Sequence, residues 1–167
     1  MAAMLHDVGK VAISDLILKK PAKLNEEEYE IMKSHTIKGA MLMGDRQSNF
    51  DEIASMVALT HHENWDGTGY PGRVDIKTGK PIEKDSKGNA ITLKGEEIPI
   101  YGRVVALSDV FDALSSKRVY KDAWDMNSVL DEIKSLSGIK FDPDLVDVFF
   151  DSLPLFYSIK NRYPDSV

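Results

Sequence analysis

The sequence predicts an all-α domain that carries one loop or short β-hairpin insertion, and three observations support this prediction. Apolar residues recur at helical spacing over most of the 167 residues. Asn, Asp and Pro stand where helices begin, and Gly or Pro follows where they end. Residues 64–98 are the exception, because Gly, Pro, Asp and Asn interrupt the helical pattern there.

The N-terminal part is predicted to be helical in four places. We expect the end of a helix at residues 1–11, one short helical turn within residues 14–24, a helix from the N-cap Asn25 to about Leu42, and a helix from about Asp51 to His61-His62-Glu63. Gly9 is a plausible breaker of the first. His35 falls on the apolar stripe of the third, so we expect it to face inward.

The interruption begins with Asn64-Trp65-Asp66-Gly67-Thr68-Gly69-Tyr70-Pro71-Gly72, which is typical of a turn-rich loop. Residues 73–93 follow, with the turn signals Thr-Gly-Lys-Pro and Asp-Ser-Lys-Gly-Asn between short β-friendly runs. This segment is predicted to be a small, exposed hairpin at the periphery.

Three helices are predicted in the C-terminal part. They are a long helix from Pro99 to about Ser116, a helix capped by Asp125 or Asn127 and ended by Gly138, and a helix opened by Asp142-Pro143 and stopped by Pro154. Asp109 stands out because it shares a stripe of the long helix with small residues only.

Composition fits a single domain over residues 1–167. Hydrophobic residues make up 43% and charged residues 29% of the chain, as in ordinary globular proteins. The absence of cysteine excludes disulfides and thiolate ligands and suits a bacterial cytoplasm. The net charge of −6 argues against DNA binding, and no apolar run is long enough for membrane insertion.

All four histidines fall in candidate sites: His6, His35, His61 and His62. Adjacent side chains on an α-helix point about 100° apart, so His6 and Asp7 should not pair well with each other, although both can reach one cation. The same holds for His61 and His62, whose two imidazoles at a helix end need two partners. A histidine in the position of His35, judged alone, is more often a satisfied core residue than a metal ligand.

An unpaired Asp109 on a helix-packing stripe would lose on the order of several kcal/mol through desolvation. It therefore needs a metal, another cation or a strong hydrogen-bonding partner. A salt bridge to Arg103 or Arg118 is the alternative to a metal. The neighbouring Asp112 is expected to be solvated.

Four imidazoles and two carboxylates without sulfur suit Fe or Mn, with Zn, Ni and Mg as alternatives, and exceed what one zinc ion uses. We therefore expect two or three divalent metal ions, with Asp7 as the bridging carboxylate. A metal-bound water has its pKa lowered from 15.7 to about 7 and can attack a phosphodiester. Lys10 could hold a phosphate oxygen, or be a surface lysine. Asp7 and Lys10 are thus the predicted catalytic residues.

The motifs His6-Asp7-Val8-Gly9-Lys10, His61-His62-Glu63-Asn64-Trp65-Asp66-Gly67 and Gly69-Tyr70-Pro71 resemble the HD-GYP family, a branch of the HD metal-dependent phosphohydrolases. Asp109 to Leu114 and Arg118 to Lys121 match further segments in order. The resemblance implies hydrolysis of the bacterial second messenger cyclic di-GMP to pGpG or GMP. It implies metal ligation by His6, Asp7, His35, His61, His62 and Asp109, and substrate contacts by Lys10, Tyr70, Arg118 and Lys121.

Two departures from the family pattern matter. Family members usually carry a Glu and a His on a helix before the HD pair; this chain has no residues there, so a third metal would lack those ligands. Residues 73–93 are longer than the usual link and are expected to alter access to the pocket. The resemblance also implies a regulatory sensor or receiver domain in the full-length protein.

Two other functions remain open from the sequence. One is hydrolysis of another nucleotide, such as mixed cyclic GMP-AMP or a (d)NTP. The other is a non-catalytic module that binds a nucleotide for signalling. Retention of the six ligands from His6 to Asp109 speaks against decay of the site and favours an enzyme.

Overall fold

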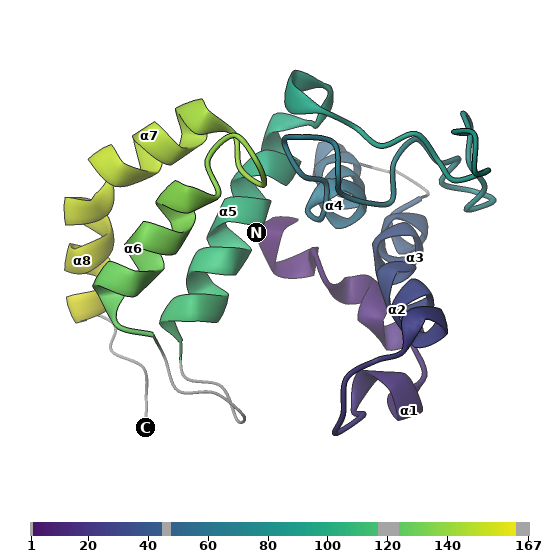
Figure 1. Cartoon of the computed structure of the whole chain (residues 1–167), viewed down its shortest axis with the longest axis horizontal. Coiled ribbons are helices and arrows are strands. Elements are labelled where there is room, and N and C mark those ends of the chain that lie inside the picture. The colour runs from purple at the N-terminus through teal and green to yellow at the C-terminus, as the bar shows by residue number, and fades with distance from the viewer. Residues whose placement is uncertain (1, 45–47, 117–123, 163–167) are drawn as a thin grey trace.

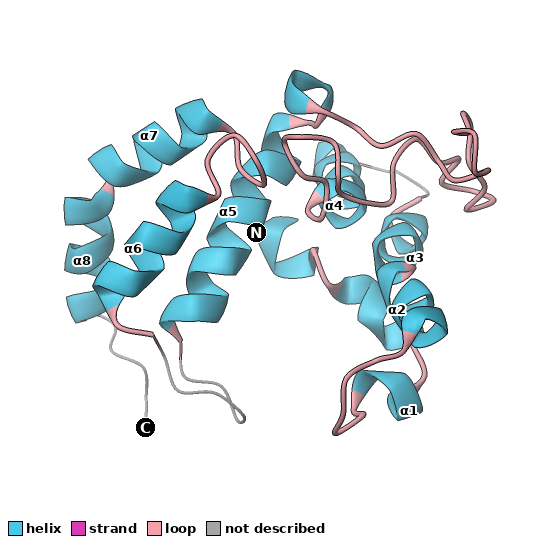
Figure 2. Cartoon of the chain, viewed as in Figure 1, coloured by secondary structure: helices cyan, strands magenta, loops and turns pink. Residues whose placement is uncertain are grey.

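A computed structural model describes residues 2–44, 48–116 and 124–162. These residues form helices and loops, and no β-strand occurs among them (Figure 2). The elements are η1 (Ala2–Leu5), η2 (Val8–Ala12), α1 (Asp15–Leu18), α2 (Glu26–Lys33), α3 (His35–Leu42), α4 (Asn49–Thr60), η3 (Gly95–Glu97), α5 (Ile100–Ser115), α6 (Met126–Ser135), α7 (Pro143–Asp151) and α8 (Leu153–Arg162), where η denotes a 3-10 helix. The all-α prediction is confirmed.

Helix α4 lies between α3 and α5 (Figure 1). Helix α4 packs against α3, α5 and η1, while η2 packs against α3. On the other side of α5, helices α6 and α7 enclose the main apolar cluster, which consists of Leu107, Val129, Ile133, Phe141, Val146 and Phe149. Through their contacts with α4 and α3, η1 and η2 lie alongside the helix bundle.

Residues 2–12 differ from the α-helix end predicted for this part of the chain. They form two 3-10 helices separated by a turn at His6 and Asp7. Gly9 is not a helix breaker but a point of close approach: a Cβ there would lie 1.9 Å from the carbonyl oxygen of His35. Glycine therefore allows η2 to lie directly against α3.

The helix predicted from Asn25 to Leu42 is divided in two. Asn25 caps α2 as expected, with Glu28 completing a capping box. Ser34 then interrupts the helix, and its hydroxyl donates a hydrogen bond to the carbonyl oxygen of Ile31 at 2.5 Å. Such local bonds compete with helix continuation. His35 consequently stands at the start of α3, where it is fully buried.

Residues 73–93, called the insertion below, form a loop rather than a hairpin of strands. Isolated antiparallel bridges join Val74 to Pro81 and Lys84 to Ala90. Asp75 and Asp85 accept backbone hydrogen bonds inside the two turns. The turn signals were therefore interpreted correctly, whereas the pairing is too short to make strands.

Two predicted helix ends in the C-terminal part are wrong. Helix α6 begins after the N-cap Asp125, as one alternative had it, but ends at Ser135, before Gly138. Helix α7 ends at Asp151, and Pro154 does not stop it but lies in the first turn of α8. Proline is compatible with a first turn, because the amide it lacks has no partner there. None of the described helices is both long and apolar enough to span a membrane.

Candidate metal centre

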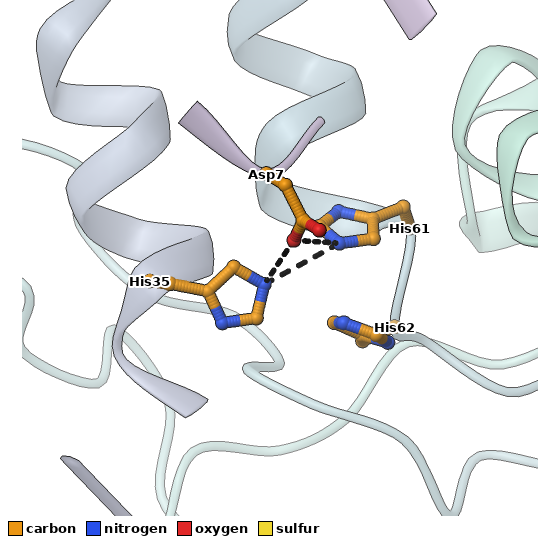
Figure 3. Close-up of side chains that lie close together, drawn as sticks. All are labelled: Asp7, His35, His61 and His62. Carbon is orange, nitrogen blue, oxygen red and sulfur yellow. Dashed lines mark hydrogen bonds and ion pairs between the residues drawn. The ribbon is translucent and has the colours of Figure 1, made fainter. Parts of the chain in front are cut away.

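Four potential ligand atoms meet at the junction of the N-terminal segment, α3 and α4 (Figure 3). Asp7, His35, His61 and His62 each offer an atom, and these atoms lie within 4.8 Å of one another. Asp7 comes from the turn between η1 and η2, His35 from the start of α3, and the other two from the end of α4. Residues distant in sequence thus form one group.

His35 and His61 direct their unprotonated nitrogens at each other. His35 Nδ1 donates to the carbonyl oxygen of Met32 at 2.7 Å, and His61 Nδ1 donates to that of Ala58 at 3.0 Å. Each Nε2 atom then carries a lone pair in the neutral ring, and the two Nε2 atoms lie 3.4 Å apart. Burial lowers the pKa of both imidazoles, that of His61 to about 4. Two facing acceptors favour a cation between them.

Asp7 contributes a carboxylate to the same position. Its Oδ1 atom lies 3.3 Å from His35 Nε2 and 3.8 Å from His61 Nε2, and it is buried with no hydrogen-bond partner among the described residues. Oδ2 accepts from Lys10 Nζ at 2.5 Å. Burial favours the neutral acid, but hydrogen bonds from His6 and Lys10 outweigh it and hold the pKa of Asp7 below its ordinary value. The donor set therefore fits a divalent cation.

His6 and Asp109 form a second pair beside Asp7. His6 Nε2 lies 3.4 Å from Asp7 Oδ2 and 3.6 Å from Asp109 Oδ1. The nearby carboxylate of Asp109, followed by that of Asp7, raises the pKa of His6 to about 10. The expectation that His6 and Asp7 would not pair is wrong, because the backbone turns there instead of continuing as an α-helix.

The alternative salt bridge between Asp109 and Arg103 is not formed. Arg103 pairs instead with Asp142 at 2.5 Å, at the N-terminus of α7. Asp112, expected to be solvated, is exposed. Arg118, the other alternative partner, lies outside the described residues, and among these Asp109 faces His6 at the edge of the candidate centre.

His62 connects the centre to the Gly-Tyr-Pro loop. Its ring stacks on that of Tyr70, with the centroids 4.9 Å apart. Burial, followed by the charges of His61 and His35, lowers the pKa of His62 to about 3, and burial raises the pKa of the Tyr70 hydroxyl. Tyr70 thus lies beside the candidate centre, as its predicted substrate contact requires.

Glu63 has a positioning role that the sequence did not reveal. It is 2% exposed, and burial raises the pKa of its carboxyl group. Oε1 accepts from the amide of Gly72 at 2.6 Å, and Oε2 from the amide of Leu93 at 3.3 Å. One carboxylate therefore holds both ends of the insertion next to His62.

Lys140 is a second residue that sequence reasoning missed. It follows α6, and its carbonyl oxygen accepts from the amide of Trp65 at 3.2 Å. Burial lowers the pKa of its ammonium, which interacts electrostatically with Asp109 and His62. Its only sequence signal was its place between Gly138 and Asp142, which pointed to a helix end.

The structure thus brings together His6, Asp7, Lys10, His35, His61, His62, Tyr70 and Asp109. Arg118 and Lys121 lie outside the described residues, so their predicted substrate contacts stay predictions.

Comparison with known proteins identifies the family. Residues 1–114 match the HD domain. The chain belongs to the HD domain family. HD domains are metal-dependent phosphohydrolases, so the group around Asp7 is a possible metal site of an HD domain.

Several relatives are similar over nearly the whole chain. The chain is 40% identical to 3'3'-cGAMP-specific phosphodiesterase 2 of Vibrio cholerae, over 98% of its own length and 28% of that protein. It is 43% identical to the cyclic di-GMP phosphodiesterase response regulator RpfG of Xanthomonas campestris, over 88% and 34%. It is also 43% identical to a cyclic di-GMP phosphodiesterase of Thermotoga maritima, over 89% and 35%. The chain spans about a third of the length of these relatives.

A solved structure supports the fold. The crystal structure of the V. cholerae cyclic GMP-AMP phosphodiesterase V-cGAP3 matches 97% of this chain and 39% of its own, with a TM-score of 0.62 at 19% identity. The chain therefore shares its helical fold with part of that structure.

Proposed function

We propose that this chain is a metal-dependent phosphodiesterase that hydrolyses cyclic di-GMP to pGpG and/or GMP. The observation that carries the proposal is the convergence of Asp7, His35, His61 and His62, whose ligand atoms lie within 4.8 Å of one another. The names of relatives at 43% identity supply the substrate class.

Two divalent cations, Fe or Mn, fit the donors best. One would be held by His35, His61, His62 and Asp7, and the other by His6, Asp109 and Asp7. Mixed nitrogen and oxygen donors without sulfur match these metals. His35 and His61 are oriented for ligation by their Nδ1 bonds to backbone carbonyls.

When bound, such metals supply a water of lowered pKa and neutralise charge on the phosphate. Lys10, which contacts Asp7 Oδ2, would exchange that contact for a phosphate oxygen. Tyr70 would contact a base, and Arg118 and Lys121 would hold phosphates. Loss of any of these substrate contacts should raise KM for cyclic di-GMP and change the metal content little.

The proposal is tested by measuring metal content and products together. The chain is purified anaerobically with Mn²⁺ or Fe²⁺, its metals are counted by mass spectrometry, and cyclic di-GMP turnover is followed by chromatography. We expect about two metals per chain and formation of pGpG or GMP. Less than about one metal and no turnover would favour the non-catalytic module, and turnover of non-cyclic nucleotides only would favour the other phosphohydrolases.

A second candidate substrate is 3'3'-cGAMP, because a relative 40% identical over 98% of the chain is specific for it. The ratio of kcat/KM for cyclic di-GMP to that for 3'3'-cGAMP decides between the two. A ratio above one supports cyclic di-GMP. A ratio below about 0.1, a clear preference in the range that one extra hydrogen bond can supply, supports the second candidate.

The relatives are about three times as long as the matched region. We propose that the remainder of the full-length protein includes a sensor or receiver domain that regulates this one. Comparing turnover by the full-length protein and by this chain tests that proposal.

A further inference from the structure

A cavity of about 520 Å³ lies between α2 and the insertion, next to the candidate metal centre. Tyr70 lines it and also stacks on His62, so one ring belongs to both places. The cavity is large enough for a purine nucleoside. None of the four clustered ligands lines it, which makes it a neighbour of the centre and not a part of it.

The wall formed by the insertion is held in place at several points. Glu63 fixes its two ends through Gly72 and Leu93. At its first turn, a Cβ on Gly79 would lie 3.5 Å from Ile37 of α3, so the insertion touches the helix bundle there. The cavity is therefore a built feature of the folded chain.

The opposite wall carries a donor and an acceptor side by side. Glu30 Oε1 and Lys33 Nζ lie 2.6 Å apart on α2, and Lys33 Nζ also lies 5.6 Å from the centroid of the Tyr70 ring. Glu30 is exposed, and an ion pair at the surface contributes little, so a ligand can replace it. Asp85, the other carboxylate among the described lining residues, is engaged by backbone amides of its own turn.

This donor and acceptor match the hydrogen-bonding edge of guanine. Guanine presents the acceptor O6 next to the donors N1–H and N2–H, so a carboxylate can accept two hydrogen bonds while an ammonium donates to O6. Adenine offers a carboxylate one donor group only, its amino group. Bidentate pairing of this kind discriminates between bases by about 1–3 kcal/mol, or roughly five- to a hundredfold.

We propose that this cavity is a guanine subsite, in which Glu30 and Lys33 read the base while the adjoining phosphate lies at the metal centre. The proposal rests on the proposed function, because it assigns one base of the cyclic dinucleotide. It makes Glu30 a specificity-determining residue and the insertion the second wall of the subsite.

Binding of mononucleotides tests the subsite without requiring catalysis. The affinities of GMP and AMP are measured by calorimetry for the metal-loaded wild-type chain, for Glu30→Gln and for Glu27→Gln. Glu27 is the matched control, since it is exposed on the same helix with no hydrogen bond or ion pair to any described residue. We expect GMP to bind about tenfold more tightly than AMP in the wild type and in Glu27→Gln. In Glu30→Gln this preference should fall to about twofold or less.

Equal affinities for GMP and AMP in the wild type, or a preference unchanged in Glu30→Gln, would overturn the subsite. Hydrolysis of cyclic di-GMP by the same samples separates this failure from that of the proposed function. Turnover without a guanine preference leaves the phosphodiesterase standing and removes the subsite. A guanine preference without turnover of any cyclic dinucleotide does the reverse.

Discussion

Among single residues, Asp7 makes the largest number of polar contacts in the candidate centre. Its two oxygens face His35 and His61 on one side and His6 and Lys10 on the other, all within 3.8 Å. A carboxylate surrounded in this way stays ionised, which is the state that a metal ligand requires.

Replacing Asp7 by Asn removes the charge with little change in shape. We expect metal content to fall below about one per chain and cyclic di-GMP turnover to fall by at least about 100-fold, because even loss of an outer-shell partner costs 10- to 100-fold. Metal analysis and steady-state kinetics provide the measurement. Asp15→Asn is the control, since the Asp15 side chain forms an exposed ion pair with Lys19, away from the candidate centre. Full metal content in Asp7→Asn would contradict the bridging role.

We predict that metal binding releases a proton from the His6 ring. Its pKa of about 10 keeps it charged at pH 8 in the metal-free protein, whereas His61, with a pKa of about 4, is neutral. Metal ligation at His6 must expel that proton. Calorimetric titration at pH 8 in buffers of different ionisation enthalpy should therefore show about one proton more released by the wild type than by His6→Gln. Equal release would exclude His6 as a ligand.

The same raised pKa has a consequence for stability. In the unfolded chain histidine titrates near pH 6.5. The charged His6 therefore stabilises the metal-free fold fully below that pH, and its contribution is lost as the pH rises through about 10. Between pH 6 and pH 10, the free energy of unfolding of the metal-free chain should therefore fall less in His6→Gln than in the wild type. Denaturation in urea at the two pH values measures this.

At the scale of elements, the insertion depends on one buried carboxylate. Glu63 follows the end of α4 and receives amides from Gly72 and Leu93, which are far apart in sequence. The same side chain thereby fixes the Gly-Tyr-Pro loop, the insertion and the position of Tyr70 relative to His62. The insertion contains only isolated β-bridges, and Glu63 holds it at its ends.

Glu63→Gln should destabilise the chain by about 1–3 kcal/mol, because the new amide group presents a donor to one of the two backbone donors. The free energy of unfolding in urea measures this. Glu83→Gln, in the exposed part of the insertion, should change stability by less than about 0.5 kcal/mol. Equal effects of the two substitutions would mean that Glu63 does not anchor the loop.

At the scale of the whole molecule, the C-terminal helices reach the candidate centre through the turn between α6 and α7. Backbone bonds from Trp65 and Asp66 to Lys140 and Ile139 join this turn to the loop after His62. The partly buried ion pair between Arg103 and Asp142 connects this turn to α5. Lys140 is thereby held where its charge acts on Asp109.

Lys140 should contribute to the positive potential that attracts a dinucleotide phosphate. We expect Lys140→Gln to raise KM for cyclic di-GMP by about threefold to tenfold at low salt, an effect that shrinks as ionic strength increases. Steady-state kinetics at two salt concentrations measure this. Lys134→Gln, on the exposed face of α6, is the control. A KM equal to that of the control at both concentrations would contradict the role.

Much of the fold was predictable because its signals are local. Asn25, Asp125 and Asp142 cap helices as expected, and Pro99 precedes the long helix α5. Two errors concern residue types that are compatible with more than one local structure. Ser34 divides one predicted helix, and Pro154 begins a helix where it was expected to end one.

The sequence by itself determined the all-α class, the set of imidazoles and carboxylates, and the resemblance to an HD phosphohydrolase. Residue type, helical spacing and adjacent motifs encode these properties. Only the tertiary structure decided which nitrogen of His35 and of His61 faces inward, that Arg103 pairs with Asp142 while Asp109 faces His6, and that Glu63 anchors the insertion. Those outcomes depend on distances between segments remote in sequence, which packing of α3, α4 and α5 sets and no local pattern records.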